Sequence, residues 1–215
     1  MRGAALYDIH GNLPALKAVL EEVEADLVVV GGDLAPGPQV AECFERLEAL
    51  EVPVRWVLGN GDREELDAEQ LARFEATVEL GPVLFCHGSP RSDEEMITQI
   101  TPPERLRPML EGVGADVVVC GHTHHQFELE LDGRRVINAG SVGLPYQGDA
   151  AAFWLLLDGD DAHMQRTAYD AAAAVELFRA LPELEDSAQA SLAEPISAAE
   201  IAEEFERRAT SRPDG

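Results

Sequence analysis

The sequence predicts an α/β fold in which two β-sheets stack face to face with helices outside them. Five apolar runs of strand length recur in the first 120 residues, and helical patterns separate the first three runs. Two hairpin signals follow in the second half, so a mixed α/β part precedes an antiparallel part. A chain of 215 residues is long enough for one domain with a large core, and we expect one domain followed by a short extension.

The five apolar runs are expected to be buried strands, because each is rich in Val, Leu or Ala. They are Gly3 to Tyr7, Asp26 to Val30, Val54 to Leu58, Pro82 to Cys86 and Asp116 to Cys120. Two helices should connect the first three strands, Leu13 to Glu24 with Asn12 as its N-cap and Val40 to Leu50. This alternation is typical of a parallel sheet. Further helices are expected at Asp67 to Ala76 and at Pro103 to Gly112.

The second half of the chain is predicted to form two hairpins. Gln126 to Leu131 and Arg134 to Asn138 flank an Asp-Gly pair, which is the strongest hairpin signal in the chain. Ala151 to Leu157 and Ala162 to Tyr169 flank a second turn that also contains Asp and Gly. These antiparallel strands complete the pattern of two stacked sheets.

The C-terminal part is predicted to be helical with one interruption. A helix from Tyr169 to Leu181 should end the domain, which we place at residues 1–181. Residues 182–215 then form an extension. Its first part, Pro182 to Pro195, is acidic and rich in small residues and is expected to be a linker. The amphipathic helix Ile196 to Arg208 should dock on the domain or on a partner, and Ser211 to Gly215 should be a disordered tail.

Composition argues against a nucleic-acid coating protein. The chain has 16 basic and 41 acidic residues, a net charge of −25, which would repel a phosphate backbone over most of the surface. An anionic substrate would therefore need concentrated positive charge at the site, and metal ions supply it compactly. There is no apolar run of membrane-spanning length and no leader pattern, so we expect a cytoplasmic protein without a membrane partner. The three scattered cysteines are expected to be buried, reduced thiols.

Polar side chains follow each of the five predicted strands at the point where the strand ends. In chain order they are Asp8 and His10, then Asp33, then Asn60, then His87, and finally His122, His124 and His125. In open α/β sheets ligands collect outside the carboxyl ends of the strands, so these groups should converge in one crevice. Any single one of them is equally well explained as a cap or a satisfied buried polar group, but chance does not account for the whole ordered set.

The donor atoms of this set favour divalent metal ions. Carboxylate oxygens, imidazole nitrogens and one amide carbonyl suit Mn, Fe or Zn and match soft copper poorly. So many ligands exceed what one ion needs. The ordered blocks D8-x-H10, G32-D33, G59-N60-G61-D62, H87 and G121-H122-T123-H124 resemble the five signature blocks of the calcineurin-like metallophosphoesterase superfamily. The lead-in YDIHGN and the later INAGSVGLP are similar to its small prokaryotic phosphodiesterase branch.

The resemblance implies a four-layer α-β-β-α sandwich with two mixed sheets and a site for two divalent ions. It implies that Asp8, His10 and His124 hold one ion, that Asp33 bridges to the second, and that Asn60, His87 and His122 complete the second. We expect Mn²⁺, with Fe, Zn or Ni as alternatives. The implied reaction is hydrolysis of a phosphodiester by a hydroxide that bridges the ions, with Asp33, Asn60 and His122 acting through that hydroxide.

One position departs from the family pattern. Many members carry a histidine after the asparagine, thought to assist the leaving group, and this chain has Gly61. Members of the small branch often lack it too. Asp62 is a substitute candidate, but with Glu65 three residues on it reads as an N-cap and capping box. His125 is the other spare candidate, either orienting a neighbouring ligand or facing solvent.

Substrate contacts and rival functions stay open at this point. Arg63 and Arg91 follow two ligand loops and would reach a phosphate by charge-assisted hydrogen bonds, or else they are solvated surface residues. Tyr146 follows GSVGLP and is a candidate for the substrate side. The rivals are a phosphomonoesterase or protein phosphatase on the same site, and an interaction scaffold with a residual metal site. We expect a small phosphoester substrate, and a homo-oligomer remains open.

Overall fold

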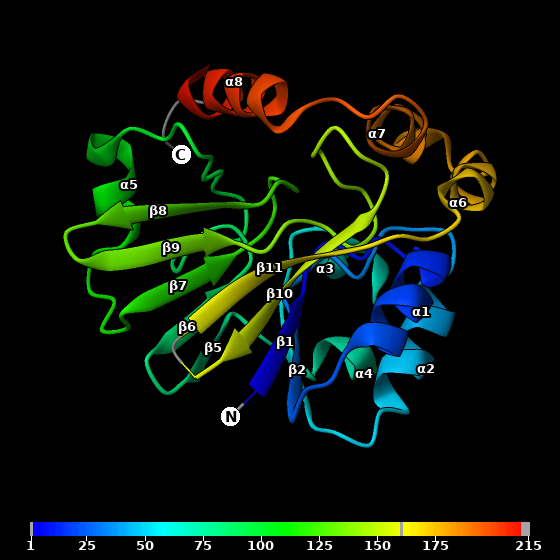
Figure 1. The fold of residues 1–215 in the computed structure, drawn as a ribbon, viewed down its shortest axis with the longest axis horizontal. Helices are drawn as coiled ribbons and strands as arrows, with labels where there is room; N and C mark the ends of the chain where they lie inside the picture. The colour runs from blue at the N-terminus through cyan, green and yellow to red at the C-terminus, as the bar shows by residue number, and fades with distance from the viewer. Residues whose placement is uncertain (1, 160, 212–215) are drawn as a thin grey trace.

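The computed structural model describes residues 2–159 and 161–211, and they form two mixed β-sheets between layers of helices (Figure 1). One sheet has the strand order β11-β10-β1-β2-β3-β4 and the other the order β5-β6-β7-β9-β8. The α/β expectation of two stacked mixed sheets is confirmed. Each hairpin of the second half joins a different sheet, because β10 pairs with β1 whereas β9 pairs with β7.

The strands of the first sheet surround a parallel centre. Strands β1, β2 and β3 run parallel, and the hairpin β10-β11 adds antiparallel strands beside β1. The bounds are β1 Arg2–Leu6, β2 Leu27–Val30, β3 Val54–Val57, β4 Phe74–Glu75, β10 Ala152–Asp158 and β11 Asp161–Thr167. Residue 160, in the expected turn of the second hairpin, lies outside the described residues.

The second sheet has a similar plan. Strands β6, β7 and β9 run parallel, with β5 and β8 antiparallel at the edges. The bounds are β5 Thr77–Leu80, β6 Val83–Cys86, β7 Val117–Cys120, β8 Phe127–Leu131 and β9 Arg134–Asn138. The strands β4 and β5 were not expected. Instead of the long helix predicted from Asp67 to Ala76, the chain has only the short helix α4 Ala68–Leu71 before it turns into these strands.

Alternation along the central strands divides the core into three layers of side chains. In β2, Val28 and Val30 pack with the helices α1 (Leu13–Glu22) and α2 (Val40–Glu48), whereas Val29 packs between the two sheets. In β7, Val119 faces the same inter-sheet core and Val118 packs with α5 (Pro103–Met109). Every central strand is covered on both faces, which explains its continuous apolar sequence.

The C-terminal part differs from the expected linker. After α6 (Ala171–Phe178), the segment 182–195 forms the short helices η1 Pro182–Leu184, α7 Glu185–Ala188 and η2 Gln189–Ala193, with Ala188 and Leu192 buried. The expected linker is instead helical, because its apolar residues pack with Leu144 and with α6. Helix α8 spans Ala198–Ser211, so Ser211 ends a helix, and the rest of the expected disordered tail lies outside the described residues.

Within the described residues, no helix combines the length and apolar character needed to cross a bilayer. The cysteines Cys43, Cys86 and Cys120 are buried and free, as expected.

Candidate metal centre

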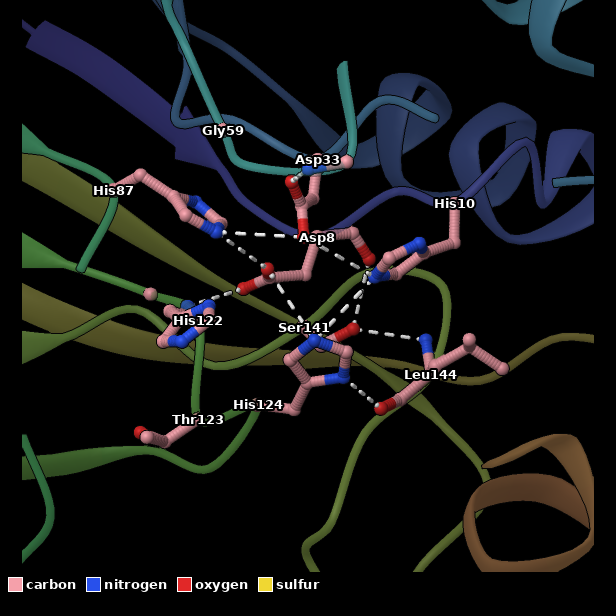
Figure 2. A network of polar contacts seen from close by, with 12 residues as sticks. Asp8, His10, Asp33, Gly59, His87, His122, Thr123, His124, Ser141 and Leu144 are labelled. Carbon is pink, nitrogen blue, oxygen red and sulfur yellow. Dashed lines mark hydrogen bonds and ion pairs between the residues drawn. The ribbon is translucent and has the colours of Figure 1, made fainter. Parts of the chain in front are cut away.

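The polar residues that follow the parallel strands converge at one end of the two sheets (Figure 2). Asp8 and His10 follow β1, Asp33 follows β2, His87 follows β6, and the segment with His122 and His124 follows β7. Backbone hydrogen bonds join the first two loops, because the N–H groups of Asp8 and His10 donate to the carbonyl oxygens of Gly32 and Asp33 at 3.0 Å. The candidate site is therefore built by loops of both sheets.

Six of these side chains form two compact clusters. Asp8, His10 and His124 form one cluster, and Asp33, His87 and His122 form the other. In each cluster the three candidate ligand atoms lie within 4.8 Å of one another. Asp33 Oδ2 lies 3.4 Å from His87 Nε2 and 3.9 Å from His10 Nε2, so this one oxygen faces a histidine of each cluster.

Both aspartates use one carboxylate oxygen to hold the backbone and turn the other toward the histidines. The His122 N–H donates to Asp8 Oδ2 at 3.0 Å, while Asp8 Oδ1 lies 3.3 Å from His124 Nε2. The Gly61 N–H donates to Asp33 Oδ1 at 2.8 Å, which leaves Asp33 Oδ2 for the clusters. This division orients each carboxylate before any ion is bound.

Backbone carbonyls also orient three of the histidines. The Nδ1 atoms of His10, His87 and His124 lie 3.1, 3.0 and 2.6 Å from the carbonyl oxygens of Pro36, Gly31 and Leu144. A carbonyl oxygen can only accept, so each Nδ1 carries a hydrogen, and Nε2 is the ring atom that faces the centre. This is the arrangement of metal-binding histidines.

The backbone at the site adopts conformations that side chains rarely take. Five of the six non-glycine residues with positive φ in the described chain belong to the two clusters, and φ at these five ranges from 47° to 65°. They are Asp8, His10, Asp33, His122 and His124. Such backbone costs about 1–3 kcal/mol per residue and persists where the surroundings hold it, which is typical of functional sites.

The unpaired atoms of the site fit a metal ion. Among the described residues, Asp8 Oδ1, Asn60 Oδ1 and His87 Nε2 are buried side-chain atoms without a hydrogen-bond partner. Buried polar atoms are normally paired, and an ion held by the two clusters would supply a partner for Asp8 Oδ1 and His87 Nε2. Asn60 stands between Gly59 and Gly61, both of which pack against Asp33. An oxygen and nitrogen donor set of this kind suits Mn, Fe, Zn or Ni.

The charges of the second cluster affect each other strongly. Burial raises the pKa of Asp33, but the neighbouring histidines, His87 first, together outweigh burial and hold that pKa below its usual value. Burial lowers the pKa of His87, but Asp33 and, to a smaller extent, Asp8 together outweigh it and raise the pKa to about 10. A cation bound here would take the place of the His87 proton.

Gly61 is tightly enclosed. A Cβ atom built at this position would lie 2.5 Å from the carbonyl oxygen of Ala35 and 2.8 Å from Pro36 Cδ. Real Cβ atoms essentially never approach a backbone atom so closely. The absence of a histidine here is therefore part of the local packing, because the Ala35-Pro36 turn occupies the space where its side chain would begin.

The capping-box prediction for Asp62 is wrong. The helix α3 (Asp62–Glu65) has Gly61 as its N-cap without a side-chain hydrogen bond, and Asp62 is fully buried. Its carboxylate accepts from the N–H groups of Asp33 and Gly59 through Oδ2, at 2.9 and 3.0 Å, and from Ala35 through Oδ1 at 3.0 Å. Burial and then the charge of Asp33 raise the pKa of Asp62 to about 7. Asp62 thus links the loop after β2 to the loop after β3 by hydrogen bonds.

The sequence did not indicate this role, because the hydrogen bonds of Asp62 to Asp33 and Ala35 join residues that are distant in the chain. The real capping box lies a few residues further on, where Asp67 accepts from Glu69 and Gln70 at 2.9 Å. The only local signal for Asp62 was its place directly after the loop Gly59-Asn60-Gly61, where a buried acid has unpaired N–H groups within reach.

His125 lies beside the site and does not face solvent. Its side chain is buried, its Nδ1 lies 2.8 Å from the Thr123 carbonyl oxygen, and its ring packs at 5.1 Å on Phe127. Its Nε2 is buried without a hydrogen-bond partner, yet His125 belongs to neither cluster.

The two arginines suggested as substrate contacts are engaged with acidic residues. Arg63 forms ion pairs with Asp93 at 2.7 Å and Glu94 at 3.3 Å. Arg91 forms an ion pair with Glu95 and donates to the Pro108 carbonyl oxygen at 3.2 Å. Both guanidinium groups therefore form ion pairs with acidic side chains in this structure.

Tyr146 lies against the first cluster. Its ring stacks on the His124 ring at a centroid distance of 5.3 Å and an interplanar angle of 18°, and its N–H donates to the His124 carbonyl oxygen at 2.9 Å. Tyr146 therefore supports His124 directly.

Comparisons with known proteins agree with this geometry. A family model described as the calcineurin-like phosphoesterase superfamily domain matches residues 1–161. A probable metallophosphoesterase of Methanothermobacter thermautotrophicus is 33% identical over 149 residues, which cover 67% of this chain and 77% of that protein. Phosphodiesterase YfcE of Escherichia coli is 31% identical over 163 residues, which cover 69% of this chain and 83% of that protein.

The fold also has a solved counterpart. The crystal structure of a metallophosphoesterase from Sphaerobacter thermophilus matches with a TM-score of 0.76 and 25% sequence identity, covering 91% of this chain and 99% of the other. This coverage extends well beyond the region that the family model matches.

Proposed function

The chain belongs to the calcineurin-like phosphoesterase superfamily, and we propose that it is a metal-dependent phosphodiesterase with a centre for two divalent ions. The observation that carries the proposal is the pair of three-residue clusters with a shared oxygen, Asp33 Oδ2, between them. Two sets of donor atoms this close together are what a two-ion centre requires.

The residues that would hold the ions follow from the geometry. Asp8, His10 and His124 would hold one ion, and His87 and His122 the other, with Asp33 shared. Asn60 would add a neutral carbonyl oxygen beside Asp33, so the centre keeps net positive charge for an anionic substrate. When bound, two divalent cations bind phosphate oxygens, neutralise the charge that develops in the transition state and lower the pKa of water.

The protein itself positions the reacting groups. The carboxylates of Asp8 and Asp33 are each fixed by a backbone N–H, and the three histidines are fixed by carbonyl oxygens, so the donor atoms need little reorganisation. No side chain stands at position 61 to protonate the leaving oxygen, and the packing there excludes one. Departure should therefore depend on the acidity of the leaving group itself.

The name of one relative favours a phosphodiester over a monoester, and the missing side chain at position 61 favours an activated leaving group. The relative from Escherichia coli carries the name phosphodiesterase, and its alignment with this chain covers 83% of that protein. Loss of the usual proton donor is best tolerated when the leaving group is stable as an anion, as in aryl diesters and activated nucleotides. We propose Mn²⁺ as the working metal, since the donor set is of the type that Mn binds.

The proposal is tested by stripping the protein with a chelator, restoring Mn²⁺, and measuring hydrolysis of an aryl phosphodiester and of the matching monoester. We expect faster hydrolysis of the diester, strict dependence on added metal, and loss of activity in Asp33→Asn. Faster monoester hydrolysis would instead establish a phosphomonoesterase. Two bound metal ions without hydrolysis of either ester would contradict the enzymatic proposal and favour a scaffold.

A further inference from the structure

The segment beyond residue 161, where the family-model match ends, packs against the residues that support His124. Leu144 is the first contact. Its carbonyl oxygen lies 2.6 Å from His124 Nδ1, and its side chain is buried in a cluster formed by α6, α7 and η2. The partners in that cluster are Ala174, Phe178, Ala188 and Leu192. The carbonyl that orients a metal-ligand candidate is thus held in place by the C-terminal helices.

Tyr146 is the second contact. One of its ring neighbours is His124, on which it stacks, and the other is Phe205 of α8, at a centroid distance of 6.1 Å and an angle of 58°. Both distances lie in the range of favourable aromatic pairs. Phe205 is buried. Nearby, the Gly148 N–H donates to the Ile196 carbonyl oxygen at 2.8 Å, which fixes the start of the α8 region to the same loop.

Glu206 is the third contact, and it is linked to the loop of His122 and His124 through the segment that contains Ile97 and Thr98. Its Oε1 accepts from Thr98 at 2.7 Å and from Thr101 and Arg105 at 2.5 Å. The residue next to Thr98, Ile97, accepts a hydrogen bond at 2.9 Å from the hydroxyl of Thr123, which stands between His122 and His124. In Figure 1, α6, α7 and α8 (orange to red) run across the top of the view from the α1 side to the α5 side.

We propose that the C-terminal helices α6, α7, η2 and α8 act as a brace, which means that they hold the loop of His122 and His124 in the conformation needed to bind an ion. Within this brace, Phe205 is a positioning residue that acts on His124 through Tyr146. The inference rests on the proposed metal centre. The loop that carries His122 and His124 has positive φ at both residues, a conformation that needs support from its surroundings. Leu144, Tyr146 and Thr123 supply this support, and all three depend on residues beyond the family match.

The brace should act on one ion site more than on the other. His124 belongs to the cluster with Asp8 and His10, and it is the histidine that Tyr146 contacts. In the other cluster His87 is oriented by the Gly31 carbonyl oxygen, which lies in the loop after β2 and is far from α8 in the chain. Loss of Phe205 should therefore weaken the first site and spare the second.

The test measures Mn²⁺ binding to the chelator-treated full-length chain by calorimetry, with two bound ions expected for the wild type. In Phe205→Ala one ion should bind about tenfold more weakly, the size typical of a lost supporting contact, while the other is unchanged. Phe205→Leu, which keeps apolar bulk in contact with Tyr146, should restore most of the affinity. Glu203→Gln, an exposed position on the same helix, is the matched control and should leave both ions unchanged.

A double-mutant cycle shows whether Phe205 acts through Tyr146. Tyr146→Leu should weaken the same ion, and adding Phe205→Ala in that background should cause no further loss. Tyr146→Leu also keeps the test valid if Phe205→Ala does not fold, which thermal unfolding would reveal. Unchanged affinities, or equal weakening of both ions in Phe205→Ala and in Phe205→Leu, would overturn the brace.

The same experiment separates this inference from the proposed function. If the wild type binds two ions but hydrolyses no ester, the proposed phosphodiesterase function is overturned. The Mn²⁺ affinities of the variants then decide the brace by themselves. If the wild type is active and both Phe205→Ala and Tyr146→Leu bind two ions with wild-type affinity, the brace is overturned and the proposed function stands. Wild type that binds no ion would overturn both.

Discussion

The Nε2 atoms of His10 and His124 lie 3.4 Å apart, although the two residues are 114 positions apart in the chain. Each ring donates from Nδ1 to a backbone carbonyl, of Pro36 and of Leu144, so in the neutral rings both lone pairs point into the same space. Two facing lone pairs repel each other, and either a proton on one ring or a cation bound by both rings removes the repulsion. The pair therefore directs two nitrogen atoms toward one place, where a cation could bind.

The first prediction concerns metal and stability. Saturating Mn²⁺ should raise the unfolding temperature of the chelator-treated protein, because the ion binds the folded chain and pairs its unpaired donors. At a concentration 100 times the dissociation constant, binding contributes about 2.7 kcal/mol, or roughly 5–10 °C for a chain of this size. Differential scanning calorimetry measures the shift, and Asp33→Asn should reduce it. An equal shift in that variant would contradict the shared role of Asp33.

The second prediction separates two aspartates of one short segment. Asp62→Asn should lower stability by about 1–3 kcal/mol, because an amide cannot accept from all three N–H groups that the carboxylate binds. It should also weaken Mn²⁺ binding, because the loops after β2 and β3 lose the hydrogen bonds that join them. Asp67→Ala removes a helix cap at a cost of about 1 kcal/mol and serves as the control, with metal affinity unchanged. Similar metal affinity in both variants would show that Asp62 contributes to the stability of the fold and not to metal binding.

The third prediction concerns the enclosed glycine. Gly61→His should not restore a leaving-group histidine, because its Cβ would collide with the Ala35 carbonyl oxygen. We expect a loss of about 1–3 kcal/mol in stability and lower activity. Gly61→Ala introduces the same Cβ without an imidazole and should be destabilised to a similar degree. A Gly61→His variant with wild-type unfolding temperature and faster hydrolysis of poor leaving groups would contradict the packing argument.

The fourth prediction follows from the missing proton donor. Across a series of aryl phosphodiesters, the rate should fall steeply as the pKa of the leaving phenol rises, and alkyl diesters should be the poorest substrates. The measurement is kcat/KM against leaving-group pKa at saturating Mn²⁺. A flat dependence would mean that another group protonates the leaving oxygen or that a physical step limits the rate.

The fifth prediction concerns the thiols. Burial, followed by the charge of Glu42, raises the pKa of Cys43 to about 12, and burial raises the pKa of Cys120 to about 12 as well. The reactive thiolate is therefore scarce at pH values below about 9. A thiol reagent such as a disulfide chromogen should label none of the three cysteines in the native protein near pH 8, and all three after denaturation. Rapid labelling of native protein would show that the core opens locally.

Strand positions and the convergence of the candidate ligands were predictable because both follow from features that are local in the chain. Each central strand is a continuous apolar run, and its polar residues follow within a few positions of its end, so topology alone brings them together. Asp8, Asp33 and His87 illustrate this. The strands β4 and β5 were not predictable, because Phe74 and Val78 stand in a segment with helix-forming residues whose pairing with β3 and β6 decides its structure.

The sequence by itself determined the order of the signature blocks, the donor types and the presence of a glycine directly after Asn60. Only the tertiary structure decided why that glycine is required, what Asp62 binds, and how the helices after residue 161 contact the loop of His124. The physical reason is the range of the interactions. A strand and the residues after it obey local rules of burial and backbone geometry, whereas hydrogen bonds and ring contacts between distant segments exist only once the chain has folded.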